Sequence, residues 1–258
     1  MKKLSLLLLT LVSFGVASYA SPLIDIQFGG NDFNGGSPVS DLQTGAGLVG
    51  SVGDQWNDFT STSALLSGVS LIYSTGTATG ATLTVSGPSV YQYAVGPAGT
   101  SSGGSYSGAN QLGGTLVGNL AQGELGAGWS ATLTLSFTGL VANTDFSIYL
   151  YSNPDRWERS SSWSVNGGAG TTVGPLNSYT GPYAVTLGYA PYVLVEGINY
   201  IVLSGTTDSS GNLTIAGTGL SSEPDINGLQ LQAVPEPSTF TMILGSLGLL
   251  TMFRRRRA

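Results

Sequence analysis

Short segments in which apolar and polar residues alternate recur along the chain, and this pattern constrains the fold more than any other feature. Ala81–Val85 and Ala131–Phe137 alternate cleanly, and Phe146–Tyr151 alternates with large residues on both faces. A period of two places successive side chains on opposite faces of a β-strand. Because no segment shows a sustained helical stripe, the pattern excludes a helical bundle and predicts an all-β fold.

The strand candidates are short, and turn residues separate them. They are Leu23–Phe28, Val69–Tyr73, Ala81–Val85, Val90–Val95, Ala131–Phe137, Phe146–Tyr151, Ser161–Val165, Tyr183–Leu187, Asn199–Leu203, Asn212–Ala216 and Gly228–Gln232. Many short strands at this spacing predict a two-sheet, jelly-roll-like β-sandwich. The turn Asp208–Gly211 lies between two of these strands and predicts a hairpin.

The chain contains no Cys and no His. It therefore has no Ser-His-Asp triad, no thiol nucleophile, no disulfide and no Cys- or His-ligated metal site. We expect no cofactor apart from a hard cation held by oxygen atoms. An exported chain without Cys fits a bacterial secretion route, where disulfides are optional.

The charged residues are distributed unevenly. Of eight basic residues, six lie at the two ends of the chain, and only Arg156 and Arg159 lie between them. Thirteen of the fourteen acidic residues lie between Asp25 and Asp225, so the body carries 2 − 13 = −11 charges. A body of this charge repels phosphate backbones, which argues against a nucleic acid partner.

The N-terminus has the features of a secretory signal peptide, predicted over residues 1–20. Met1–Lys3 is a positive region, Leu4–Val16 is apolar, and Ser18 and Ala20 place small residues before a cut that follows Ala20. Such a segment is removed by signal peptidase, so we exclude it from the fold. The alternative interpretation is a retained N-terminal anchor.

The C-terminus, residues 234–258, has three ordered parts. Pro235, Glu236 and Pro237 come first, the apolar stretch Thr239–Phe253 predicts a single transmembrane helix, and Arg254, Arg255, Arg256 and Arg257 close the chain. The arginines hold their end in the cytoplasm by the positive-inside rule. Because the apolar stretch is short for a permanent span, a transient anchor that is cleaved explains it better than a plain tail anchor.

These three parts resemble the PEP-CTERM sorting signal. The resemblance implies processing by an exosortase-type enzyme in the inner membrane of a Gram-negative bacterium. It also implies transient anchoring there, followed by release to the cell surface or to an exopolysaccharide matrix. The signal specifies a destination rather than the activity of the body.

The body, residues 21–233, carries a fainter resemblance to galactose-binding-like jelly-roll domains. The similarity rests on the order of Asp25–Gly29, Val52–Asn57, Phe146–Tyr151 with the loop that contains Arg156, and Asn227–Leu231. It supports the sandwich fold, and it transfers no sugar-binding residue.

The segment Gly53–Asp58 is the most polar cluster in the first half of the chain. Trp56 is a candidate for stacking on a sugar ring, with Asp54, Asn57 and Asp58 bonding hydroxyl groups. Oxygen ligands of this kind also suit a structural Ca²⁺ ion. The alternative is a turn rich in Asp and Asn with Trp56 packed in the core.

The segment Asn153–Arg159 holds both internal arginines and Trp157, and it is predicted to be an exposed loop between two strands. Arg156 can donate hydrogen bonds to vicinal hydroxyls while Trp157 stacks on a sugar ring. The alternative is a loop that pairs with itself, in which Asp155 and Glu158 neutralise the arginines.

These features lead to two functional hypotheses. The first is a non-catalytic surface or matrix protein that binds extracellular polysaccharide weakly or serves as a structural or adhesive module. The second is a secreted glycoside hydrolase that uses a carboxylate pair, with Asp54 and Asp58 or Asp155 and Glu158 as candidate pairs. Binding without release of product distinguishes the first from the second.

Overall fold

The computed structural model describes residues 22–28, 47–51, 53–59, 62–94, 123–152, 159–175, 194–221 and 223–235. The predicted signal peptide and the predicted sorting helix both lie outside these ranges. The predicted strand Tyr183–Leu187 does so as well.

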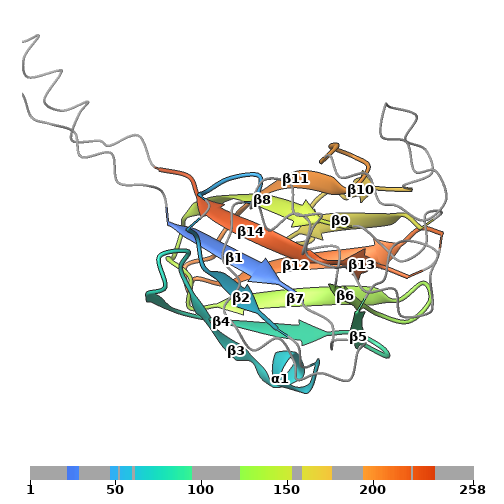
Figure 1. Ribbon diagram of the computed structural model, residues 1–258, viewed down its shortest axis with the longest axis horizontal. Coiled ribbons are helices and arrows are strands. Elements are labelled where there is room, and N and C mark those ends of the chain that lie inside the picture. The colour runs from blue at the N-terminus through green and yellow to red at the C-terminus, as the bar shows by residue number, and fades with distance from the viewer. Residues whose placement is uncertain are drawn as a thin grey trace, which may run out of the picture.

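Strands dominate the described residues, with one short helix beside them (Figure 1). The elements are β1 (Leu23–Gln27), β2 (Trp56–Asp58), α1 (Thr62–Ser67), β3 (Val69–Ile72), β4 (Ala78–Ser86), β5 (Tyr91–Ala94), β6 (Gly123–Gly126), β7 (Thr132–Thr138), β8 (Asp145–Tyr151), β9 (Ser161–Val165), β10 (Thr171–Val173), β11 (Tyr200–Thr206), β12 (Leu213–Gly219), β13 (Asp225–Ile226) and β14 (Gly228–Ala233). The prediction of an all-β sandwich is confirmed.

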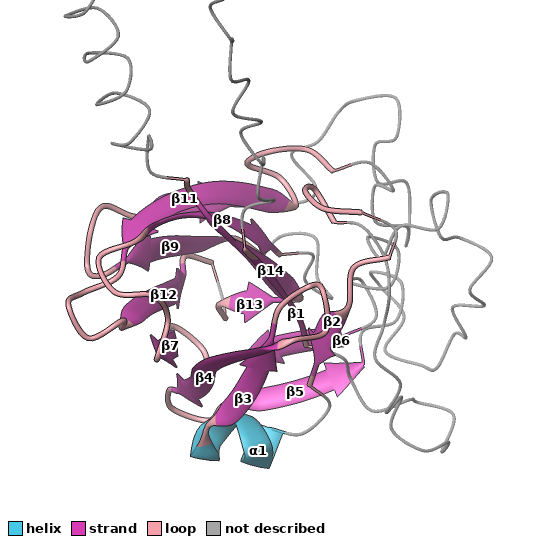
Figure 2. Cartoon of the chain, turned by 90° about the vertical axis from the view of Figure 1, so that its left-hand side faces the viewer, coloured by secondary structure: helices cyan, strands magenta, loops and turns pink. Residues whose placement is uncertain are grey.

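The strands form two large sheets that face each other as layers, visible in Figure 2. One has the order β11-β8-β14-β1-β2, and the other has the order β10-β9-β12-β7-β4-β3. A small third sheet has the order β13-β6-β5. All these strand pairs are antiparallel except β1 with β2, which is parallel.

The alternating pattern builds the core between the layers. In β7, Leu133, Leu135 and Phe137 are buried, while the Thr and Ser residues between them are exposed or half-buried. β8 buries Phe146, Ile148 and Leu150 from the opposite layer. Each such aliphatic or aromatic side chain stabilises the fold by roughly 1.5–3 kcal/mol when it leaves water.

Trp163 in β9 shows why a glycine is needed opposite it. Its indole is fully buried, and a Cβ placed on Gly217 of β12 would lie 2.5 Å from the ring. Gly217 is paired with Trp163 in the register of the two strands. A glycine at this position therefore makes room for one of the two fully buried tryptophans.

The predicted hairpin at Asp208–Gly211 is wrong. The turn is tight, and the backbone amide of Asp208 donates to the carbonyl of Asn212 over 3.0 Å. However, β11 before it pairs with β8, and β12 after it pairs with β7 and β9 of the other layer. The turn therefore carries the chain from one layer to the other. A local sequence pattern does not show which sheet the next strand will join.

Four short strands, β2, β6, β10 and β13, and the helix α1 were not predicted from the sequence. The strands have two to four residues, which is too few to show an alternating pattern. Each is a strand because it pairs with another one, as β2 does with β1 and β10 does with β9.

The register gives the sandwich two distinct ends. β1 begins where β14 finishes, because Leu23 pairs with Gln232 and the amide of Ala233 donates to the carbonyl of Pro22 over 3.0 Å. We call this the anchor end; it lies at the left of Figure 1. The opposite end, where β8 stops and where β7 and β9 start, is called the far end.

Candidate functional site

The predicted ligand-binding loop is attached at the far end. Residues 153–158, with Arg156 and Trp157, lie outside the described residues, but both sides of the loop are described. On one side, the Ser152 hydroxyl donates to the carbonyl of Asp225 over 2.7 Å. On the other side, the carbonyl of Ser160 accepts from the amide of Leu220 over 2.9 Å. The structure therefore fixes where the loop leaves and rejoins the sandwich.

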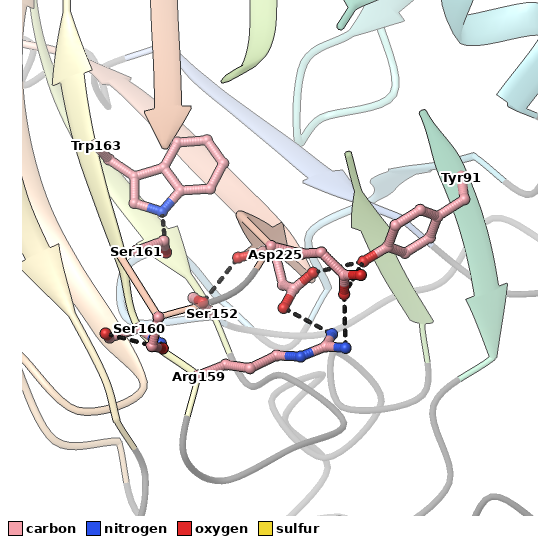
Figure 3. Close-up of polar contacts among 9 residues, drawn as sticks. Tyr91, Ser152, Arg159, Ser160, Ser161, Trp163 and Asp225 are labelled. Carbon is pink, nitrogen blue, oxygen red and sulfur yellow. Dashed lines mark hydrogen bonds and ion pairs between the residues drawn. The ribbon is translucent and has the colours of Figure 1, made fainter. Parts of the chain in front are cut away.

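Arg159 closes this loop, and it is a buried structural residue rather than an exposed one. Its guanidinium lies 3.0 Å from Asp225 and 2.6 Å from Glu223 (Figure 3). The hydroxyl of Tyr91 donates to the same two carboxylates over 2.9 and 3.1 Å. Arg159 therefore has partners on and beside β13, outside its own loop. The alternative in which Asp155 and Glu158 neutralise the arginines lies outside the described residues and stays untested.

Trp56 is also a structural residue. Its indole is fully buried on β2 and lies 6.5 Å from the ring of Tyr151, centre to centre, at an interplanar angle of 51°. A ring in this position cannot stack on a sugar at the surface. The predicted ligand-binding role of Trp56 is therefore wrong, and the core-packing alternative holds.

The polar residues next to Trp56 in sequence make hydrogen bonds within the fold. Asp54 accepts hydrogen bonds from the amide and the hydroxyl of Ser51, over 2.7 and 2.8 Å, and closes a turn. The amide group of Asn57 bonds the backbone of Asp25 and Ile72 and so ties β2 to two neighbouring strands. In the part of the chain that the structure describes, no three acidic side chains come together to hold a metal ion. The predicted Ca²⁺ site stays untested.

A buried polar network lies on the outer face of the five-stranded sheet. Gln230 of β14 donates to the Asp25 carboxylate over 2.7 Å and accepts from the Tyr151 hydroxyl over 2.5 Å. Tyr151 in turn accepts from the amide of Leu48 over 2.7 Å, and Gln230 donates to the carbonyl of Val49 over 2.9 Å. The network holds the segment 47–51 against the sheet.

Asp25 is the titratable group of this network. Burial raises the pKa of its carboxyl from 3.8 to about 7, the hydrogen bond from Gln230 lowers it, and the charge of Asp54 raises it further. Its second oxygen, Oδ2, accepts no hydrogen bond from any described residue. Burial also raises the pKa of the Tyr151 hydroxyl, which therefore stays protonated and remains a donor.

We expect the stability of the fold to depend on Asp25 and on pH. Between about pH 4 and pH 7 the folded chain keeps a proton that the unfolded chain has lost, so the free energy of unfolding falls as pH rises through this window. At about 1.4 kcal/mol for each pKa unit, the loss is roughly 2–4 kcal/mol. Asp25→Asn should remove this part of the dependence of the free energy of unfolding on pH. Urea unfolding of the parent and of Asp25→Asn at pH 4.5 and 7.5 measures this dependence. An equal change in the free energy of unfolding between the two pH values in both proteins would contradict the assignment to Asp25.

The sequence reasoning missed one exposed aromatic residue at the far end. Trp129 lies in the turn before β7, and 68% of its surface is exposed. Leu220, at the end of β12, is 57% exposed. The sequence Gly128-Trp129-Ser130 offered a signal, because a Trp between two small turn residues and before a strand has few neighbours to cover it.

Comparison with known proteins identifies the C-terminal segment. Residues 233–257 match the pattern described as the PEP-CTERM protein-sorting motif. The chain carries a PEP-CTERM motif. The motif starts at Ala233, the last residue of β14, and the amide of Val234 still bonds the carbonyl of Asp145 over 2.8 Å. The PEP-CTERM segment therefore follows directly on the sandwich, at its anchor end.

The PEP-CTERM motif implies an exported protein that passes through the membrane-bound exosortase pathway. Within the described ranges, no helix has the length and apolar character needed to cross a bilayer. The predicted sorting helix of the motif, Thr239–Phe253, lies outside those ranges and stays a prediction.

The body of this PEP-CTERM chain has only distant structural similarity to solved proteins, and no curated protein matches the chain in sequence. A β-glucuronidase 2 from Bacteroides uniformis is 14% identical, with a TM-score of 0.39 over 83% of this chain and 18% of that one. An exo-β-1,3-galactanase from Phanerochaete chrysosporium is 14% identical, with a TM-score of 0.30 over 62% and 30%. The Cry4Aa toxin of Bacillus thuringiensis is 10% identical, with a TM-score of 0.30 over 60% and 24%. The chain spans less than a third of each, and similarities this low carry no conclusion about activity.

Proposed function

We propose that this chain is a non-catalytic protein of the cell surface or the exopolysaccharide matrix, whose β-sandwich binds extracellular polysaccharide or serves as an adhesive module. The PEP-CTERM motif carries the proposal, because it implies export and a transient anchor. Signal peptidase and an exosortase-type enzyme are the processing partners. The polysaccharide is the ligand.

The placement of the predicted loop supports this function. The PEP-CTERM segment continues from Ala233 at the anchor end, whereas the loop 153–158 joins the sandwich at the far end, beside Ser152 and Arg159. Ser152 and Arg159, between which the loop joins the sandwich, therefore lie at the opposite end from Ala233. We expect a ligand that reaches the anchored protein from outside the cell to meet this end first.

The ion pairs of Arg159 reduce the number of candidate residues for contact with the polysaccharide. The body holds only two basic residues, and Arg159 is engaged by Glu223 and Asp225. Of the two, Arg156 is therefore the candidate to donate hydrogen bonds to sugar hydroxyls. Trp157, next to it in sequence, supplies an aromatic face for stacking.

We expect Trp157→Ala to weaken polysaccharide binding by about 1–3 kcal/mol, the range for loss of a stacked aromatic contact. The melting temperature should stay within about 2 °C of the parent, since the loop is predicted to be exposed and a residue in such a loop contributes little to stability. Trp157→Phe keeps an aromatic face and should retain most of the affinity. Titration of soluble polysaccharides into the full-length chain, by calorimetry, measures these effects.

A large fall in melting temperature with unchanged polysaccharide affinity would contradict the role of Trp157. A reducing-sugar assay on the same samples provides the enzymatic control. Release of new reducing ends would support the alternative hypothesis of a glycoside hydrolase and would contradict a non-catalytic module.

A further inference from the structure

The outer face of the five-stranded sheet has a covered part and an open part. The segment 47–51 is bonded to the sheet through Gln230 and Tyr151, and both of these side chains are buried. On β11, and next to it on β8 and β14, other outward side chains are half-buried or exposed. We call four residues of this open part the platform: Tyr149, Tyr200, Val202 and Gln232.

The strand register makes the platform residues neighbours. Val202 of β11 lies directly opposite Tyr149 of β8, and Tyr200 is diagonal to Tyr149 because it pairs with Tyr151. Gln232 of β14 is diagonal to Tyr149 on the other side of β8. Opposite and diagonal residues of neighbouring strands lie roughly 5–8 Å apart, which is within reach of aromatic side chains. The platform therefore extends over three adjacent strands.

The sheet holds the two tyrosines of the platform in place. Tyr149 and Tyr200 both pack against the buried cluster of Tyr151 and Trp56, yet each remains half-buried rather than covered. The hydroxyl of Tyr149 donates to Oε1 of Gln232 over 3.4 Å, and the amide nitrogen of Gln232 donates to no described residue. A site on rigid strands, with side chains fixed by packing, binds without first ordering a loop.

Tyrosine is an unexpected residue on this open face. The solvated face of β7, in the other sheet, carries only Thr and Ser between its buried residues, as a half-exposed antiparallel strand usually does. β8 instead carries Tyr149 and Tyr151 on its outer face. A tyrosine combines an apolar ring with a polar hydroxyl, so it suits a partner that has both characters. A sugar ring is such a partner, because it presents C–H groups on its faces and hydroxyl groups at its edge.

The charge of the sheet selects the class of sugar polymer. Its five strands contain three carboxylates, Asp25, Asp58 and Asp145, and neither Lys nor Arg. Glu196, which is exposed and bridged to Tyr200, adds a fourth carboxylate beside the platform. A polyuronate would be repelled by this surface, and a neutral polymer would not.

We propose that the platform binds a neutral polysaccharide, with the rings of Tyr149 and Tyr200 against sugar C–H groups and the amide nitrogen of Gln232 donating to a sugar hydroxyl. The proposal rests on the function proposed above, and it adds a surface and a class of ligand. The platform spans two strand spacings, or about 10 Å. A polymer of several sugar rings covers this distance, whereas a single sugar does not.

Binding of the full-length chain to a neutral β-glucan, a neutral galactan and anionic alginate, by calorimetric titration, tests the proposal. We expect the parent to bind a neutral polymer and not alginate. Val202→Glu places a charge beside Tyr149 at a position that is 39% exposed, and it should weaken binding about tenfold. Tyr200→Ala should have an effect of the same size, and Tyr200→Phe, which keeps the ring, should weaken binding less than about threefold.

Ser70→Glu is the matched control for Val202→Glu. Ser70 is exposed on β3, which is an edge strand of the other sheet as β11 is of this one. The substitution adds the same charge away from the platform, so its affinity should equal that of the parent. The melting temperature is measured for every variant. Because Val202 is exposed, Val202→Glu keeps the test valid even if Tyr200→Ala does not fold.

The outcomes separate this proposal from the proposed function. If the parent binds none of the three polymers, the proposed function fails. If the parent binds and Trp157→Ala weakens binding while Val202→Glu and Tyr200→Ala do not, only the platform is overturned. Equal losses in Val202→Glu and Ser70→Glu also overturn it, since net charge then explains the effect. Preferential binding of alginate overturns the neutral class. If Val202→Glu dissociates a dimer in analytical ultracentrifugation and leaves polysaccharide binding unchanged, the platform contacts a second copy of the chain instead.

Discussion

Replacing Arg159 by alanine should lower the free energy of unfolding by about 3–5 kcal/mol, the cost of breaking a buried ion pair by removing one partner. The guanidinium neutralises Asp225, whose side chain is 1% exposed, and also binds Glu223. Without it, both carboxylates and the Tyr91 hydroxyl stay in place with no cation. The effect is measured as the shift in the urea unfolding curve.

Two further substitutions make the Arg159 test specific. Arg159→Lys keeps the charge, but one ammonium group cannot replace the two nitrogens that contact two carboxylates, so an intermediate loss is expected. Arg156→Ala removes the same side chain three residues earlier, in the predicted loop, and should change stability by less than about 0.5 kcal/mol. Equal effects of Arg156→Ala and Arg159→Ala would contradict the structural role of Arg159.

Trp56→Ala should also lower the free energy of unfolding by about 3–5 kcal/mol, the usual cost of deleting a buried tryptophan. The indole is fully buried on an edge strand and forms a cluster with Tyr151, against which Leu48 and Leu194 pack. Its loss leaves a cavity over the Asp25 network. Trp56→Phe should cost less, because it leaves a smaller cavity.

The Trp56 test separates packing from binding. The affinity of the folded fraction for polysaccharide should be unchanged in Trp56→Ala, whereas Trp157→Ala should change affinity with little effect on stability. Urea unfolding and calorimetric titration on the same preparations give both quantities. A stable Trp56→Ala protein that has lost polysaccharide binding would contradict the burial of this residue.

The long strands of this fold could be predicted from the sequence because their side chains alternate over five or more residues. β7 and β8 show this pattern, and the layers that they form follow from burying one face of each. β2 could not be predicted, because its three residues pair with β1 about thirty positions earlier in the chain. The same long-range pairing buries Trp56, so its role could not be read locally.

The same limit applies to the candidate site, whose local features could be predicted from the sequence and whose long-range contacts could not. The sequence indicated that Arg159 and Trp157 belong to one loop between two strands, and the structure places both sides of that loop at the far end. It could not indicate that Arg159 pairs with a carboxylate 66 residues away. Nor could it indicate that the turn carrying Trp129 is tied to the turn Gly87–Val90 by a hydrogen bond from the amide of Gly128 to the carbonyl of Pro88, because this contact joins distant segments.

Hydrogen exchange of the full-length chain with and without saturating polysaccharide tests the central claim most directly, because it locates the ligand on the sandwich. We expect protection to rise at the far end, at residues 152, 159–160 and 220–221, and in the predicted loop 153–158 that joins the sandwich there. The turns at the anchor end, residues 139–144 and 207–212, should exchange at the same rate in both samples. Protection of the anchor-end turns, or no change anywhere while the polysaccharide is bound, would contradict binding at the far end.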